Sequence, residues 1–189
     1  FRIRSKPSIY HLEENMSNGT TVKKRNGRGT EPLDLEKMHK MVEEACKGVA
    51  GVSASQVEIQ SGIQFYDGIT TAEIQEILIK SASDLIDLEN PNYQYVAARL
   101  LLFSLRKSLY GKIREMPHLE SQIMGCTSYD VYDKEIFTKY SKEEIDKANG
   151  FIDHDRDFLF TYAGLRQVVD KYLVQDRSTG QAYETPQFM

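Results

Sequence analysis

Charged side chains of both signs gather within residues 22–37, VKKRNGRGTEPLDLEK. Lys24 and Arg25 precede an Asn26-Gly27 pair, which predicts a two-residue β-hairpin turn because both of its positions tolerate positive φ. The segment then becomes acidic, and Asp34 is a good N-cap for a following helix. The first N–H groups of a helix lack intrahelical partners and favour a negatively charged ligand, as do nearby cations. The residue types at this hairpin-to-helix junction therefore predict a polyphosphate site.

A nucleoside triphosphate carries about four negative charges, so its site needs cations and N–H donors from several segments. Lys37 in the first predicted helix and Lys107 in a later one could add cations. Thr71 would place a hydroxyl and free N–H groups at the start of another helix. Glu31 and Asp34 could accept hydrogen bonds from an exocyclic amine, which would favour adenine over guanine. The alternative is that these residues are ordinary solvated surface charges.

The elements that would position these residues are mostly helices. The hairpin is followed by four predicted helices, over about 35–46, from 53 to 67, from 70 or 71 to 90, and over 92–110. Ser53 with Gln56, and Thr70 with Glu73, have the spacing of a capping box at a helix start. Apolar residues recur at helical spacing within these segments. This part of the chain is therefore expected to be mainly α-helical.

Pro117 marks a predicted domain boundary. Beyond it, the sequence predicts a short helix over 119–124 and another after Ser141, where Glu144 completes a capping box. A longer helix is expected over 158–172, and a turn then separates two β-like runs, 172–175 and 181–184. The motif HDRD, residues 154–157, is expected to provide capping and ion pairing before the longer helix.

The junction, together with the motifs FYDGI, YQYVAARL and HDRD in this order, resembles the N-terminal part of class I ribonucleotide reductase large (α) subunits. The resemblance implies a mainly α fold: an ATP-cone, made of a small β-hairpin capping a four-helix bundle, followed by a helical segment. That segment would lead into an α/β barrel that lies beyond Met189. The implied division is the cone at 22–112 and the helical segment at 113–189, and the polar, aperiodic extension at 1–21 is expected to be disordered.

The resemblance also implies a nucleotide site for ATP or dATP as allosteric effector. In the family, the positions that line the activity-site nucleotide match seven residues of this chain: Lys24, Arg25, Glu31, Asp34, Lys37, Thr71 and Lys107. Gln75 stands where relatives often have histidine near the sugar, so it is a further candidate for discriminating dATP from ATP. Arg28-Gly29 lengthens the hairpin loop by one residue, which affects the expected placement of Arg25.

The function implied by the resemblance is the activity switch of a ribonucleoside-diphosphate reductase. ATP would permit turnover and dATP would stop it by changing subunit assembly. The partners would be further copies of the large subunit and a radical-generating small subunit. No catalytic residue is expected within the chain, which starts at Phe1 and ends at Met189 as the front of a longer protein would. The alternatives are a free-standing adenine-nucleotide sensor and a helical interaction module without a ligand.

Composition excludes several other classes of protein. The net charge of −4 argues against a surface that coats nucleic acid. No apolar run approaches the roughly 20 residues that span a bilayer, and the N-terminal segment lacks the apolar core of a secretory signal. Cys46 and Cys126 are too few for a disulfide framework, which indicates the cytoplasm. The four histidines have no metal-ligand spacing with these cysteines, so no metal is expected.

Overall fold

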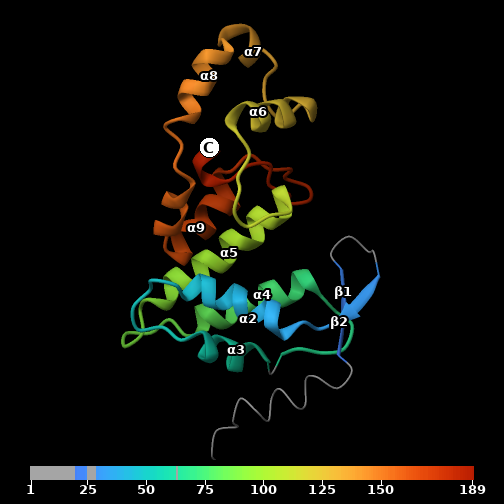
Figure 1. Ribbon diagram of the computed structural model, residues 1–189, viewed down its shortest axis with the longest axis vertical. Helices are drawn as coiled ribbons and strands as arrows, with labels where there is room; N and C mark the ends of the chain where they lie inside the picture. The colour runs from blue at the N-terminus through green and yellow to red at the C-terminus, as the bar shows by residue number, and fades with distance from the viewer. Residues whose placement is uncertain (1–19, 25–28, 63) are drawn as a thin grey trace, which may run out of the picture. The chain divides into compact units, whose positions relative to one another are not determined.

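The computed structural model describes residues 20–24, 29–62 and 64–189 (Figure 1). The chain forms two compact units that divide between Leu101 and Leu102. This division falls inside helix α5 (Tyr93–Tyr110), earlier than the boundary that the sequence places after residue 112. The predicted extension lies outside the described residues apart from its last two, and so does the predicted Asn26-Gly27 turn.

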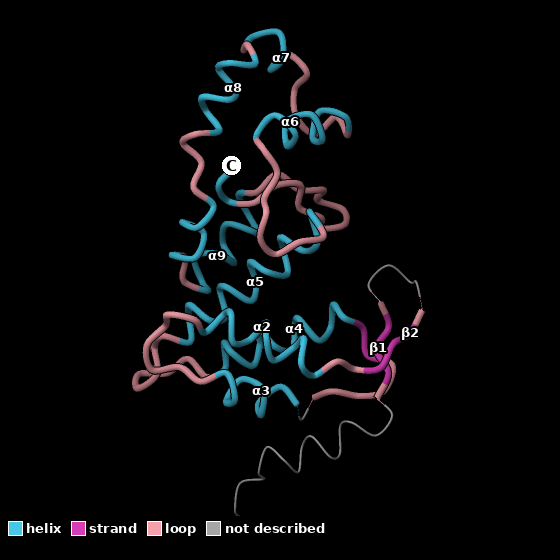
Figure 2. The backbone as a smooth tube through the Cα atoms, viewed as in Figure 1, coloured by secondary structure: helices cyan, strands magenta, loops and turns pink. Residues whose placement is uncertain are grey.

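The first unit contains a small sheet of three strands, β1 (Thr21–Lys23), β2 (Thr30–Pro32) and β3 (Ile69–Thr70). Their order is β2-β1-β3, with β1 antiparallel to β2 and parallel to β3 (Figure 2). Val22, in the centre, lies opposite Glu31 on one side and Ile69 on the other, and both apolar side chains are buried. The sequence predicted only the hairpin, because a two-residue strand is too short to show an alternating pattern.

The motif FYDGI ties this third strand to the hairpin. The Asp67 carboxylate accepts hydrogen bonds from the backbone N–H and the hydroxyl of Thr21, at 2.7 and 2.8 Å. These bonds lower the pKa of Asp67, the backbone bond first. Gly68 has a φ of +79° and donates its N–H to the Thr21 carbonyl at 2.8 Å. Glycine adopts this left-handed conformation without a steric penalty, so the motif turns the chain sharply into β3.

Three helices pack in sequence in the first unit: α2 (Leu35–Cys46), α3 (Ala54–Gly62) and α4 (Thr71–Asp84). Figure 1 shows the strands at one end of α2 and α4. The predicted caps are confirmed: Asp34 accepts the Lys37 N–H at 3.0 Å, and Thr70 with Glu73 forms a complete capping box. The first half of α5 completes the unit and contributes Val96, which is fully buried.

The helix start predicted at Ser53 is confirmed, but the expected bond between the Ser53 N–H and the Gln56 side chain is replaced by bonds to Tyr93. The Ser53 N–H donates to the Tyr93 hydroxyl at 2.9 Å, and that hydroxyl lies 2.6 Å from Oε1 of Gln56. Tyr93 is only 1% exposed. A buried tyrosine hydroxyl needs polar partners, so Tyr93 takes both groups that would otherwise have bonded to each other. A partner 40 residues away cannot be read from local spacing.

The second unit is built from short helices. They are α6 (Leu119–Ser128), α7 (Ile136–Lys139), α8 (Lys142–Asn149), η1 (His154–Leu159), α9 (Tyr162–Gln167), η2 (Val168–Tyr172) and η3 (Pro186–Phe188). The predicted box at Ser141 and Glu144 is confirmed as the start of α8. The predicted helix from residue 119 is also present, and it extends beyond the predicted end.

The helix predicted over 158–172 begins later than expected and is not a single regular α-helix. The 3₁₀ turn η1 ends at Leu159, and the backbone is extended at Phe160. Thr161 then caps a new helix, α9, by accepting the Gly164 N–H at 3.3 Å. The last part, η2, is wound as a π-helix. Within the described residues, the two β-like runs form no regular strand and meet at one bridge, between Gln175 and Ala182.

A buried ion pair holds the HDRD segment in the second unit. Nη2 of Arg106 lies 2.9 Å from Oδ2 of Asp157 and donates to the His154 carbonyl at 2.6 Å. Both charged side chains are almost fully buried, at 2% and 0% exposed. The guanidinium also lies over the Phe158 ring, 5.1 Å from its centroid. The expectation that this motif serves ion pairing is therefore confirmed.

Candidate nucleotide-binding site

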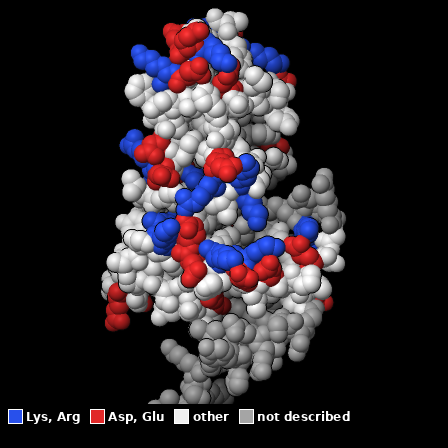
Figure 3. Space-filling model, viewed as in Figure 1, with Lys and Arg blue, Asp and Glu red and all other residues white. Residues whose placement is uncertain are grey.

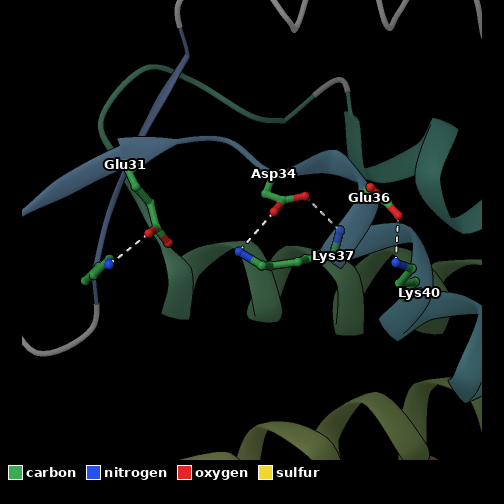
Figure 4. A network of polar contacts seen from close by, with 6 residues as sticks. Glu31, Asp34, Glu36, Lys37 and Lys40 are labelled. Carbon is green, nitrogen blue, oxygen red and sulfur yellow. Dashed lines mark hydrogen bonds and ion pairs between the residues drawn. The ribbon is translucent and has the colours of Figure 1, made fainter.

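The hairpin brings the first cation and the first acid of the predicted site together. Lys24 directly follows β1, and its N–H donates to the Gly29 carbonyl at 3.2 Å. Its ammonium lies 2.9 Å from Oε2 of Glu31 on β2, as Figure 4 shows for the labelled glutamate. The hydrogen bond from Lys24 lowers the pKa of Glu31. Both side chains are roughly half exposed, so this ion pair is open to solvent and to a ligand.

The second acid and cation lie at the start of α2. Asp34 uses Oδ1 to cap the helix, and its Oδ2 lies 3.0 Å from the Lys37 ammonium (Figure 4). The backbone hydrogen bond from Lys37 is the largest cause of the lowered pKa of Asp34, and Asp34 in turn raises the pKa of Lys37. One turn on, Lys40 pairs with Glu36 at 2.6 Å. Cations and carboxylates are thus already paired along the first turns of α2.

The start of α4 lies beside this hairpin because β3 pairs with β1. Lys23 is opposite Thr70, the N-cap of α4, and Thr71 is the first residue of the helix. Thr70 uses the N–H of Glu73 for its cap, at 3.1 Å. The other N–H groups of a first helical turn have no intrahelical carbonyl to bind, which makes a helix start suitable for an anion. The sheet therefore brings Lys24, Glu31 and Thr71 near one another from separate segments.

Two predicted cations are not placed at this site by the structure. Arg25 lies outside the described residues. Lys107 is an exposed residue of α5 and belongs to the second unit, which begins at Leu102. These two residues remain candidates from the sequence alone.

Gln75 lies in the interior of the first unit. Its side chain is 5% exposed, and Nε2 lies 3.8 Å from the sulfur of Met41 on α2. This contact joins α4 to α2. Met41 was not predicted as the partner of Gln75. The available signal was its position four residues after Lys37, on the same face of α2.

The comparisons with known proteins identify the kind of domain that contains these residues. Residues 20–108 match the family model of the ATP cone domain. The chain is 46% identical over 174 residues to ribonucleoside-diphosphate reductase 1 subunit alpha of Escherichia coli (strain K12), covering 92% of the chain and 23% of that relative. It is 44% identical over 161 residues to the ribonucleoside-diphosphate reductase subunit alpha of Enterobacteria phage T4, covering 84% of the chain and 21% of that relative.

The chain therefore carries an ATP cone domain and is similar, over 92% of its length, to part of the alpha subunit of ribonucleoside-diphosphate reductase. It matches the N-terminal region of its relatives. The chain spans less than a quarter of the length of the curated relatives, 23% for the Escherichia coli subunit. The alpha subunit of Helicobacter pylori (strain ATCC 700392 / 26695), at 39% identity over 171 residues, is similar over 89% of the chain.

The position of Gln75 leads to a prediction about nucleotide selectivity in the cone. We expect Gln75→His to change the ratio of the ATP and dATP affinities about two- to tenfold, the effect of one hydrogen bond gained or lost. The imidazole would replace an amide that both donates and accepts, at a position buried against Met41. Competition titrations of both nucleotides against both variants measure the ratio. An unchanged ratio would show that discrimination depends on other residues.

His39 joins α2 to α3 in the cone. Its Nδ1 lies 2.7 Å from Oε1 of Glu58 on α3, and its Nε2 lies 3.3 Å from Oε1 of Glu43 on α2. The two carboxylates face opposite nitrogens of the ring, so the three groups do not converge on one metal ion. The hydrogen bond with Glu58 is the largest cause of the raised pKa of His39. The ring is therefore a proton-dependent link between the two helices.

We expect this link to make cone stability depend on pH. Because the pKa of His39 is raised above its ordinary value, its contribution is full below about pH 6.5 and is lost as the pH rises through the folded-state pKa. The contribution is small because the side chain is 47% exposed. Thermal unfolding of the wild-type chain and His39→Gln should differ most near pH 6. A difference that is constant up to about pH 9 would contradict this assignment.

One cluster of possible metal ligands occurs in the described residues: His118, Glu120 and Asp146. His118 caps α6 by accepting the Glu120 N–H at Nδ1, at 3.3 Å. In a neutral imidazole the proton then sits on Nε2, which faces Asp146 at 3.7 Å. In this neutral ring Nδ1 caps α6, and the Nε2–H points towards the Asp146 carboxylate, so both ring nitrogens face polar groups.

The two thiols lack the environment of reactive cysteines. Burial raises the pKa of Cys46 to about 11, with a smaller contribution from Glu58. Burial also raises the pKa of Cys126. Since the thiolate is the nucleophilic form, the raised pKa makes both thiols weak nucleophiles at neutral pH.

Lysine and arginine are interspersed with acidic residues over the visible face (Figure 3). No helix in the described part of the chain is long and apolar enough to cross a membrane.

Proposed function

We propose that the cone of this chain is an allosteric activity site that binds ATP or dATP and controls a ribonucleoside-diphosphate reductase. The observation that carries the proposal is the arrangement within the ATP cone match. There, one sheet brings Lys24 and Glu31 together with the start of α4, beside the acid-capped start of α2. This arrangement combines cations, carboxylates and free helix N–H groups, as an adenine nucleotide requires.

In this proposal, the nucleotide replaces ion pairs that already exist. Lys24 and Lys37 exchange the carboxylates of Glu31 and Asp34 for phosphate oxygens. The carboxylates are then available to accept hydrogen bonds from the exocyclic amine of adenine. Thr71 and the first N–H groups of α4 bind the phosphates. Arg25 and Lys107 remain candidates for further charge from the sequence alone, and Gln75 remains a candidate for discrimination at the sugar. The cone itself is a four-helix bundle capped by the hairpin.

The reductase activity would belong to the whole subunit. It would reduce ribonucleoside diphosphates through a thiyl radical on a cysteine outside these 189 residues, in an α/β barrel. A small subunit would generate the radical in the cytoplasm, and dATP would alter the assembly of large subunits. The similarity covers 92% of the chain, whereas the cone match ends at residue 108. It therefore continues past the cone, which favours a reductase over a free-standing sensor.

Displacement of a fluorescent ATP analogue from the 189-residue chain tests the adenine-nucleotide site. We expect ATP and dATP each to displace the analogue fully, because they compete for one site. GTP should be a much weaker competitor, because its 6-oxo group cannot donate to Glu31 or Asp34. Displacement by GTP as effective as that by ATP would contradict a site that selects adenine. A ribonucleotide reduction assay of the same chain should show no product.

A further inference from the structure

The C-terminal end of α2 is held by a side chain from another helix. A helix leaves its last four carbonyls without intrahelical partners, and its dipole favours a cation there. In α2, which is described in full, the last turn contains Glu43 and Glu44 and no basic residue. Arg99 of α5 supplies the missing cation. Its Nη1 donates to the carbonyls of Ala45 at 3.1 Å and Lys47 at 2.6 Å.

Two residues about two helical turns before Arg99 bind the segment that follows α2. The Asn92 amide donates to the Ala50 carbonyl at 2.9 Å. The Tyr93 hydroxyl accepts the Ser53 N–H at 2.9 Å. With Arg99, these side chains bind four backbone groups between residues 45 and 53. The start of α5 therefore fixes both the end of α2 and the connection from α2 to α3.

The opposite end of α2 carries part of the nucleotide site. Asp34 caps the first turn, and Lys37 lies within it. The helix has 12 residues and is therefore about 18 Å long, so Arg99 acts far from this first turn. A helix moves as a rigid rod more readily than it stretches, because each residue is bonded to the next turn. A shift at the Arg99 end would therefore displace Asp34 and Lys37 together.

We propose that Arg99 is a positioning residue for the nucleotide site. It sets the axial position of α2 through the carbonyls of Ala45 and Lys47, and thereby the position of Lys37 relative to the hairpin and the start of α4. The proposal rests on the proposed function, because it assumes that the nucleotide binds at the first turn of α2. By reciprocity of binding free energies, a nucleotide held at that turn also stabilises the contact with α5.

The test is ATP binding by Arg99→Met and Arg99→Lys in the 189-residue chain, measured by calorimetry. Methionine keeps much of the aliphatic stem and removes both hydrogen bonds. We expect its Kd for ATP to rise about three- to tenfold, the range for residues that modulate binding without touching the ligand. Lysine keeps the charge but loses the planar fork, so its Kd should be intermediate. Lys40→Met is the matched control, because it removes an exposed cation from α2 that is paired with Glu36. Its Kd should not change.

Two outcomes separate positioning from a purely structural role. Arg99→Met combined with Lys37→Met should raise the Kd by less than the product of the two single effects, because both act through the first turn of α2. A lowered unfolding temperature with an unchanged Kd would overturn the proposal. If Arg99→Met does not fold, an unchanged Kd of folded Arg99→Lys overturns it equally. Absence of ATP binding by the wild-type chain would instead refute the proposed function.

Discussion

Arg106→Met is expected to lower the free energy of unfolding of the second unit by about 3–5 kcal/mol, the usual cost of leaving one partner of a buried ion pair alone. Asp157 is fully buried and would lose the guanidinium at 2.9 Å. The carbonyl of His154 would lose its donor as well. Thermal unfolding followed by circular dichroism should show the loss. Hydrogen exchange should place it in residues 102–189.

The loss should depend on pH in a definite direction. Burial already raises the pKa of Asp157, and Arg106 opposes this effect. Without the guanidinium the pKa rises further, so the folded variant keeps a proton that the unfolded chain releases above about pH 4. Stability of the variant should therefore fall as the pH rises from about 4 towards the new pKa, and the deficit should be smallest in acid.

Two further variants test this explanation. Arg166→Met removes an arginine that is 41% exposed and lies 3.6 Å from Asp170, so its effect should stay within about 0.5 kcal/mol. Arg106→Met combined with Asp157→Leu replaces the whole pair by apolar groups, which is often neutral. The double variant should recover most of the stability. A double variant as unstable as the single one would show that the unpaired carboxylate is not the cause.

Lys24→Met is expected to raise the Kd for ATP about tenfold to hundredfold, as expected for one charge-assisted phosphate contact. In the described structure the ammonium is paired with Glu31 and is 47% exposed, so folding does not depend on it. The unfolding temperature without nucleotide should therefore change little. Salt should reduce the difference between the wild type and the variant, because it screens exposed charges.

Lys40→Met is the control for this measurement too. Like Lys24→Met, it removes one positive charge, but from α2, one turn beyond Lys37, where the Lys40 side chain pairs with Glu36. Its Kd should remain close to that of the wild type. Equal losses in both variants would mean that ATP responds only to the overall charge of the surface and not to a defined contact at Lys24.

Local signals in the sequence predicted three of the helix starts correctly. Asp34, Thr70 and Ser141 each cap a helix as their spacing indicates, because an N-cap depends on residues within one turn. The two ion pairs, at the hairpin and at the start of α2, also join residues that are close together in the chain. The sequence could therefore predict this part of the candidate site, which depends on one hairpin and one helix start.

Long-range contacts account for what the sequence did not show. Asp67 binds Thr21, 46 residues earlier, and so creates β3 and places the start of α4 beside the hairpin. Tyr93 replaces the predicted capping partner of Ser53 in the same way. The resemblance made Gln75 a candidate for a contact with the sugar, and its packing against Met41 in the interior was not predicted. Each result depends on a partner that no local pattern identifies.

The most direct test of a nucleotide site in the cone is a calorimetric titration of ATP into the wild-type 189-residue chain. We predict saturable binding, abolished by prior saturation with dATP and weakened by Lys24→Met but not by Lys40→Met. Binding should also raise the unfolding temperature of the first unit, because a ligand stabilises the state to which it binds. A chain with a normal helical circular dichroism spectrum that gives no binding heat and no stabilisation with either nucleotide would contradict the account.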